Sequence, residues 1–118
     1  MSYDIDLTDP ITEETLILEQ PHQMKGGTFA VGGCRHASLN ITYNYADHYL
    51  KVLGPDGIRT IYGMTGGESI QVLKQAVDQL SDNVSEDYWE PTEGNAKAAL
   101  LQLMALAQMR PDGVWKGD

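Results

Sequence analysis

A change of hydrophobic period partway along the chain constrains its fold most strongly. In the first half, apolar and polar residues alternate over 3–7 and 37–45, which is the period of a strand with one buried face. In the second half, apolar residues recur every three or four positions, as in an amphipathic helix. Strands followed by helices are typical of α+β domains. We therefore expect an antiparallel sheet, built from N-terminal strands and hairpins and covered by two or three C-terminal helices.

Shorter segments are expected to complete the sheet and to lead into the helices. Residues 15–19 follow an Asp-Pro turn and predict the return strand of a hairpin with the first strand. A short strand is expected at 28–31, between two glycine pairs, and another at 58–62, after a Gly-Pro-Asp-Gly turn. Between these strands, apolar residues at helical spacing favour a short helix near 45–53.

Two longer helices are predicted in the C-terminal half. Thr65 and Glu68 have the spacing of a capping box, and an apolar stripe at helical spacing follows them as far as Leu80. Residues 92–109 predict a second helix that is apolar on nearly every side, which is typical of a helix at the centre of a core or at an oligomer interface. We therefore expect a homo-oligomer. The length of 118 residues fits a single compact domain, 1–118.

Composition argues against several classes of protein. Cys34 is the sole cysteine, so the chain can form no intramolecular disulfide and no cysteine-based zinc site. A formal net charge of −9 disfavours direct binding to nucleic acid phosphates. The sequence has no apolar run long enough to span a membrane, and its N-terminus is acidic and without a signal core. We expect a cytoplasmic protein that contacts neither membrane nor nucleic acid.

Few residues suggest catalysis or metal binding. Cys34 and His36 are close in sequence, but no third group that would orient them is evident. The histidines His22, His36 and His48 lack the helical spacing of a metal-binding pair. We expect no catalytic residue, no metal and no cofactor, and we interpret the chain as a binding protein rather than an enzyme.

The segment 25–62 is the first candidate site because its charge differs from that of the rest of the chain. Between Gln20 and Pro55, Asp47 is the only acidic residue, and glycines there allow close backbone approach to an anion. Arginines bind phosphate groups, and asparagine side chains form hydrogen bonds with the edge of a nucleotide base. Tyrosines such as Tyr43 offer surfaces on which a base stacks. The candidate ligand-binding residues are Arg35, Asn40, Thr42, Asn44, Tyr45 and Arg59.

A plainer interpretation of the same segment stays open. In this interpretation the segment is an ordinary polar sheet face beside glycine-rich turns, with the tyrosines in the core. On one strand, Asn40 and Asn44 face the side opposite to Tyr43 and Tyr45. Either the tyrosines belong to the core, or the strand bends, or a neighbouring subunit supplies the stacking.

The segment 78–93 is the second candidate site, and it is strongly acidic. Its carboxylates occur without any lysine or arginine among them, and aromatic residues lie in the middle. Such a surface suits docking on a basic groove, with a tryptophan as the anchor. The candidate partner-binding residues are Asp82, Glu86, Asp87, Trp89 and Glu90. The alternative is a solvated loop between two helices.

Five segments spread along the chain carry a resemblance to a known group of proteins: Tyr3–Pro10, Gly26–Gly33, Asn40–Tyr45, Gly94–Ala99 and Met109–Trp115. Over nearly its full length the chain resembles small uncharacterised accessory proteins encoded by phages and prophages of Gram-positive bacteria. The group has no catalytic or binding motif that transfers to residues of this chain. The resemblance implies the cytoplasm of an infected or lysogenic cell and an action on host defence.

Three functions are therefore expected in turn. The first is a non-enzymatic protein that sequesters a small anionic ligand, such as a nucleotide-like immune signal, in the segment 25–62. The second is an acidic inhibitor that docks on a basic host protein, such as a nucleic-acid-processing defence enzyme, through the segment 78–93. The third is a structural or assembly part of a phage.

Overall fold

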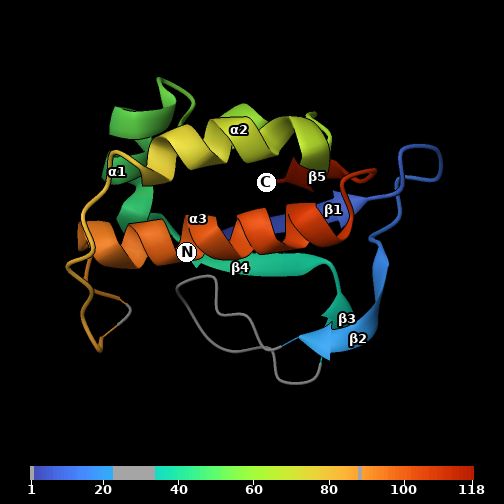
Figure 1. The fold of residues 1–118 in the computed structure, drawn as a ribbon, viewed down its shortest axis with the longest axis horizontal. Coiled ribbons are helices and arrows are strands. Elements are labelled where there is room, and N and C mark those ends of the chain that lie inside the picture. The colour runs from blue at the N-terminus through green and yellow to red at the C-terminus, as the bar shows by residue number, and fades with distance from the viewer. Residues whose placement is uncertain (1, 23–33, 88) are drawn as a thin grey trace.

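The computed structural model of the protein describes residues 2–22, 34–87 and 89–118, and its elements confirm the α+β class (Figure 1). Strands come first and the longer helices later. The elements in chain order are β1 (Ser2–Thr8), β2 (Ile17–His22), β3 (Cys34–His36), β4 (Ser38–Thr42), η1 (Tyr43–Tyr45), α1 (Ala46–Leu53), η2 (Gly57–Ile61), α2 (Gly66–Val77), α3 (Glu93–Met109) and β5 (Val114–Gly117), where η marks a 3₁₀ helix.

Strand β1 is the centre of a three-stranded antiparallel sheet with the order β4-β1-β5. Its alternating pattern places Tyr3, Ile5 and Leu7 on one buried face, as expected for a half-buried strand. These side chains share one hydrophobic core with Leu73 of α2 and Leu100 of α3. The two longer helices therefore cover the apolar face of the sheet, as predicted (Figure 1).

The predicted hairpin between 3–7 and 15–19 is wrong in its pairing. The two segments meet only at their ends, through the bridge between Thr8 and Thr15 and the hydrogen bond from Leu16 N to the main-chain oxygen of Leu7 at 2.9 Å. Strand β2 pairs instead with β3 in a separate two-stranded sheet. The physical reason is that β4 pairs with β1 from Ser2 to Asp6, so only the last residues of β1 are left for residues 15 and 16. The expected strand at 28–31 lies outside the described residues.

Two segments that were expected to be extended are 3₁₀ helices. The strand predicted over 37–45 ends at Thr42, whose side-chain oxygen accepts a hydrogen bond from Asn44 N and caps η1. The strand predicted at 58–62 is η2, in which Ile58 and Ile61 are both fully buried. A spacing of three places both side chains on one side of a 3₁₀ turn.

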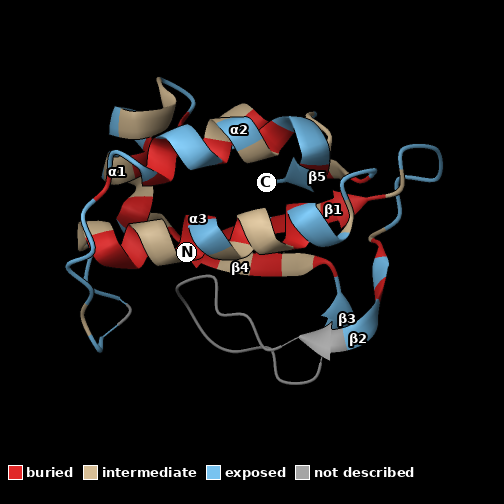
Figure 2. Cartoon of the chain, in the orientation of Figure 1, coloured by how far each residue is buried: buried red, intermediate tan, exposed pale blue. Residues whose placement is uncertain are grey.

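The predicted helices are confirmed. Helix α2 begins with the expected capping box, in which Glu68 N donates to Thr65 Oγ1 at 3.1 Å and Thr65 N donates to Glu68 Oε1 at 3.0 Å. Helix α3 buries one side in the core and leaves the other side partly exposed (Figure 2). Within the described part of the chain, none of the helices is long and apolar enough to cross a membrane.

Candidate functional site

The predicted ligand-binding residues include two that lie in the interior. Tyr45 is completely buried, and its ring meets Tyr49 edge-to-face with centroids 6.2 Å apart. Thr42 is only 1% exposed and caps η1. Because the ring of Tyr45 belongs to the core, it offers no surface on which a ligand could stack, in line with the plainer interpretation of the tyrosines.

Two further predicted ligand residues use their polar groups to hold the fold. Arg35, on β3, donates from Nε to the main-chain oxygen of Leu18 at 3.0 Å. The amide of Asn40 donates to Ser2 Oγ at 2.7 Å and to the carboxylate of Asp4. These bonds tie neighbouring strands together across the polar side of each sheet.

Asn44 joins the first candidate site to the second. It lies exposed on η1, and its Nδ2 donates to the main-chain oxygen of Trp89 at 2.9 Å. Its amide therefore supports the segment before α3, whereas Arg35 and Asn40 bond within the two sheets. The structure places these predicted residues on separate elements rather than around one pocket.

Arg59 lies on a pair of tyrosine rings. Its guanidinium carbon is 5.0 Å from the ring centroid of Tyr3 and 5.9 Å from that of Tyr43, and its Nε donates to the main-chain oxygen of Asp118 at 2.8 Å. The two rings meet edge-to-face with centroids 4.5 Å apart. Among the described residues, neither Nη atom of Arg59 has a hydrogen-bond acceptor, so this arginine keeps donors in a fixed position.

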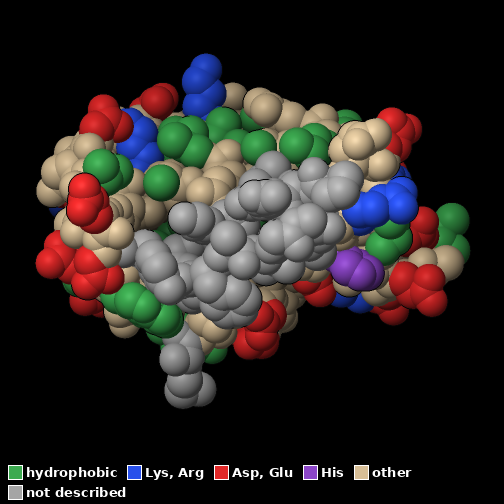
Figure 3. Space-filling model, turned by 90° about the horizontal axis from the view of Figure 1, so that it is seen from below, with side chains coloured by type: hydrophobic (Ala, Val, Ile, Leu, Met, Phe, Trp, Pro, Cys, Tyr) green, Lys and Arg blue, Asp and Glu red, His purple; other side chains and the backbone are tan. Residues whose placement is uncertain are grey.

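The predicted partner-binding residues are all exposed and lie on the segment 78–92, which we name the acidic loop; its residue 88 lies outside the described residues. It connects α2 to α3 at one end of the molecule, where acidic side chains gather in Figure 3. The side chain of Asp82 is 88% exposed, and Glu86, Asp87 and Glu90 are exposed as well. Trp89 is 46% exposed in their midst.

A buried amide in the first turn of α3 holds the acidic loop in shape. Asn95 accepts a hydrogen bond from Ser85 N through Oδ1 at 3.0 Å. Its Nδ2 donates to the main-chain oxygens of Asp87 at 3.1 Å and Glu90 at 3.0 Å. Asn95 is 8% exposed, so these bonds form away from competing water. These bonds therefore fix the main chain of the loop at Ser85, Asp87 and Glu90.

Close packing of the main chain adds a second constraint on the acidic loop. Gly94 N donates to Asn83 Oδ1 at 3.1 Å, and a Cβ at Gly94 would lie 2.5 Å from Val84 N. Only glycine fits such an approach of two backbones. From the other side, His48 Nε2 lies 2.6 Å from the main-chain oxygen of Pro91. The loop thus rests on both α1 and α3.

The carboxylates of the acidic loop differ in how far they are neutralised. Asp82 forms an ion pair with Lys97 at 2.8 Å. Asp87 accepts a hydrogen bond from Trp89 N at 3.0 Å, which fixes the turn before the tryptophan. Within the described residues, no lysine or arginine pairs with Glu86, Asp87 or Glu90. The negative charge of these three groups is therefore presented to solvent.

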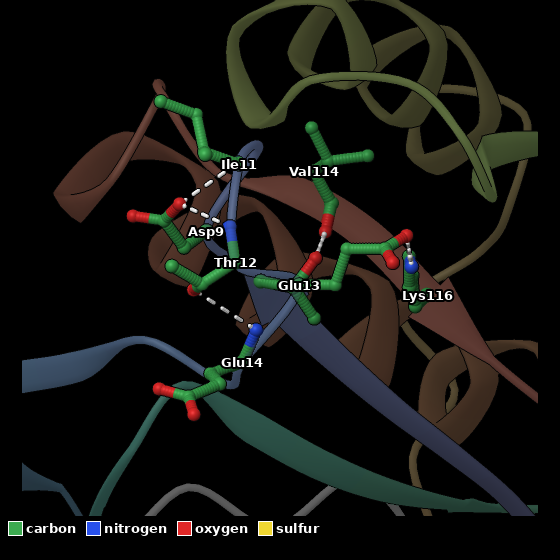
Figure 4. A network of polar contacts seen from close by, with 8 residues as sticks. Asp9, Ile11, Thr12, Glu13, Glu14, Val114 and Lys116 are labelled. Atoms are coloured by element: carbon green, nitrogen blue, oxygen red, sulfur yellow. Dashed lines mark hydrogen bonds and ion pairs between the residues drawn. The ribbon is translucent and has the colours of Figure 1, made fainter.

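A second turn closed by hydrogen bonds, residues 9–14, lies between β1 and β2 (Figure 4). Asp9 Oδ1 accepts hydrogen bonds from Ile11 N at 2.8 Å and Thr12 N at 2.9 Å, and these bonds, that of Thr12 first, lower the pKa of Asp9. Glu13 pairs with Lys116 of β5. These contacts explain how the turn is closed, and they bring no group of reactive side chains together.

Sequence reasoning found the acidic loop but missed the residues that shape it. Asn95 and His48 bind main-chain atoms of the loop through their side chains, and Gly94 donates from its own main chain. The one weak signal in the sequence was Asn95, a polar residue inside an otherwise apolar helix. Among the described residues, no group of three His, Cys, Asp or Glu side chains is arranged to hold a metal ion. Comparisons with protein-family models, with curated proteins and with solved structures found no match to this chain.

Proposed function

We propose that this protein is a non-enzymatic binding protein that docks on a basic surface of a protein partner through the acidic loop. The observation that carries the proposal is the combination of unpaired carboxylates and a half-exposed Trp89 on a segment fixed by the buried Asn95. A surface that is already ordered loses less conformational entropy on binding than a flexible one.

The chemistry of the loop indicates the kind of partner. Negative charges speed the encounter with a positive surface and align the two molecules, and a tryptophan supplies apolar contact at the centre. A groove lined with lysine and arginine, of the kind that holds nucleic acid phosphates, has the complementary charge. The resemblance to phage accessory proteins supports the proposal that the partner with this groove is a host nucleic-acid-processing enzyme.

The proposal is tested by reversing the unpaired charges of the loop. The variant carries Glu86→Lys, Asp87→Lys and Glu90→Lys, and its control carries Glu14→Lys, Glu19→Lys and Asp56→Lys at exposed positions elsewhere. Both variants change the net charge equally. Tagged proteins are used to capture basic partners from a bacterial lysate at low and moderate salt.

The wild type and the control variant are expected to capture the same basic protein, and the loop variant is expected to lose it. Because Trp89 is the central anchor in this proposal, Trp89→Ala is expected to weaken binding by about 2 kcal/mol or more. Binding should also weaken as salt is added. Equal capture by the loop variant, or the absence of any captured protein with the wild type, contradicts the proposal.

A small anionic ligand is the second candidate function, and Arg59 is the observation that favours it. Its guanidinium is held over Tyr3 and Tyr43 with Nη donors that no described residue uses. In the same lysate experiment, mass spectrometry of the heat-released fraction reports any bound nucleotide. A nucleotide that is lost with Arg59→Ala and kept with the loop variant would favour this second function over the first.

A further inference from the structure

The outer side of α3 carries a row of apolar residues that is not part of the core and is flanked by Gln102 and Gln108. Leu101 is 46% exposed and Met109 is 51% exposed, although α3 lies in the middle of the molecule. Ala98 and Ala105, which are partly exposed, share this face at helical spacing. In Figure 3, hydrophobic side chains form a row along the upper edge of the molecule.

The charge around this face distinguishes it from the rest of the surface. Residues 98–109 form the longest stretch of the chain without Asp, Glu, Lys or Arg. At its two ends the nearest charges neutralise each other, Lys97 with Asp82 at 2.8 Å and Arg110 with Asp112 at 2.9 Å. In a protein with a net charge of −9, this face of α3 therefore carries no charged side chain of its own helix.

We propose that the outer face of α3, formed by Ala98, Leu101, Ala105 and Met109, binds the same face of a second copy of this chain. Two copies of a strongly acidic protein repel each other, so they associate best where both surfaces are neutral. A closed pair is formed by one self-complementary patch related by a two-fold axis. The outer face of α3 meets both conditions.

The two helices run antiparallel in this dimer. A two-fold axis at the level of Leu103 places Leu101 of each copy opposite Ala105 of the other, so that a large side chain faces a small one. The dipoles of two antiparallel helices point in opposite directions, which is a favourable arrangement. The acidic loop precedes α3, so this arrangement places the two loops at opposite ends of the helix pair.

The length of α3 keeps the two acidic loops from repelling each other. Seventeen residues span about 25 Å. This is about three times the screening length of about 8 Å at physiological ionic strength. A parallel arrangement would instead bring the loops together. The antiparallel dimer therefore leaves both loops accessible. The proposal of this dimer does not depend on whether the loops bind a partner.

The size of the face sets the expected strength of the dimer. Stable complexes bury about 800 Å² on each partner, and one side of a single helix provides less. We therefore expect a weak dimer that dissociates on dilution. Salt screens the repulsion between two negative proteins, so added salt strengthens this dimer, whereas it weakens docking through the acidic loop.

Analytical ultracentrifugation of the purified protein, from micromolar to millimolar concentration, tests the proposal. The average mass is expected to rise from 13.0 kDa towards twice that value, and to rise further with salt. Leu101→Glu is expected to remain monomeric over the same range. Ile11→Glu is the matched control, because it adds the same charge at an apolar residue that is 89% exposed elsewhere, and it is expected to dimerise nearly as the wild type does.

Circular dichroism and thermal unfolding verify that each variant is folded, and Ala105→Glu provides a second variant of the face. A wild type that stays at 13.0 kDa at every concentration overturns the proposal. So does dimerisation that survives both Leu101→Glu and Ala105→Glu, since the interface would then lie elsewhere. Growth beyond the dimer overturns the closed two-fold arrangement.

Discussion

At the scale of single residues, the position of a buried amide decides whether it has a structural role. Asn95 is buried in the first turn of α3, and its three hydrogen bonds to the acidic loop satisfy both polar atoms of the side chain. Gln102 lies farther along the same helix, and its buried Oε1 has no hydrogen-bond partner among the described residues. Asn95 therefore organises the acidic loop, whereas Gln102 Oε1 holds no other part of the described chain.

Replacing Asn95 by alanine should loosen the acidic loop and lower the stability of the whole protein. Three lost hydrogen bonds, each contributing about 1 kcal/mol, predict a decrease of about 2–3 kcal/mol in the free energy of unfolding. Gln102→Ala serves as the control and should change stability far less. Urea unfolding measures both, and hydrogen exchange of the amides between Ser85 and Glu90 reports the loop. Similar losses for the two variants would contradict this role for Asn95.

The sequence allows the exposed charges to be predicted but not the amides that organise them. The acidic residues of 78–93 are expected at the surface because a carboxylate is costly to bury, and the structure places them there. The roles proposed for Asn40 and Asn44 depended on a straight strand from 37 to 45. Because η1 replaces its end, the two amides point to unrelated partners, Asp4 and the main chain of Trp89.

At the scale of elements, β5 shows why some parts of the fold have no local signal. It spans only Val114–Gly117, and its place is determined by distant contacts. Trp115 is completely buried opposite Leu7, and its indole N–H donates to Ser69 Oγ of α2 at 2.7 Å. The helices, by contrast, were predictable because their caps and apolar stripes are local. Long-range pairing leaves no comparable pattern in a short segment.

Ser69→Ala tests the bond that fastens β5 to α2. The variant leaves the buried indole N–H of Trp115 without its acceptor, which predicts a loss of about 1–3 kcal/mol in the free energy of unfolding. Trp115→Phe removes the donor, so the double variant should lose less than the sum of the single variants. Urea unfolding of the wild type, the two single variants and the double variant, monitored by circular dichroism, provides the double-mutant cycle. Strict additivity would show that this hydrogen bond does not stabilise the fold.

At the scale of the whole molecule, folding shifts the ionisation of groups at both ends of the pH range. The main-chain N–H of Thr65 lowers the pKa of Glu68, and the guanidinium of Arg110 lowers that of Asp112. Burial raises the pKa of Tyr49, and burial and then the nearby Asp118 raise that of Tyr62. The folded state therefore favours charged carboxylates and neutral tyrosines, and pH changes its stability in opposite ways at the two ends.

The free energy of unfolding should accordingly pass through a plateau near neutral pH and fall on both sides. Carboxylates with a lowered pKa stabilise the fold above their ordinary pKa of about 4, and this contribution is lost as the pH falls through the lowered value. Tyrosines with a raised pKa contribute fully below about 10, and their contribution is lost as the pH rises through the raised value. Urea unfolding between pH 3 and pH 11, values chosen to bracket these ordinary pKa values, measures both limbs.

Tyr62→Phe isolates the alkaline limb. The hydroxyl of Tyr62 is buried without a hydrogen-bond partner among the described residues, so its removal should leave stability at neutral pH unchanged or slightly higher. The same change should reduce the loss of stability above pH 10, because one raised pKa is gone. Tyr49→Phe is the matched control: its hydroxyl donates to the main-chain oxygen of Ala96 at 3.0 Å, so this variant should lose about 0.5–1.5 kcal/mol at neutral pH. An alkaline limb as steep in Tyr62→Phe as in the wild type would mean that Tyr62 ionises alike in the folded and unfolded chains.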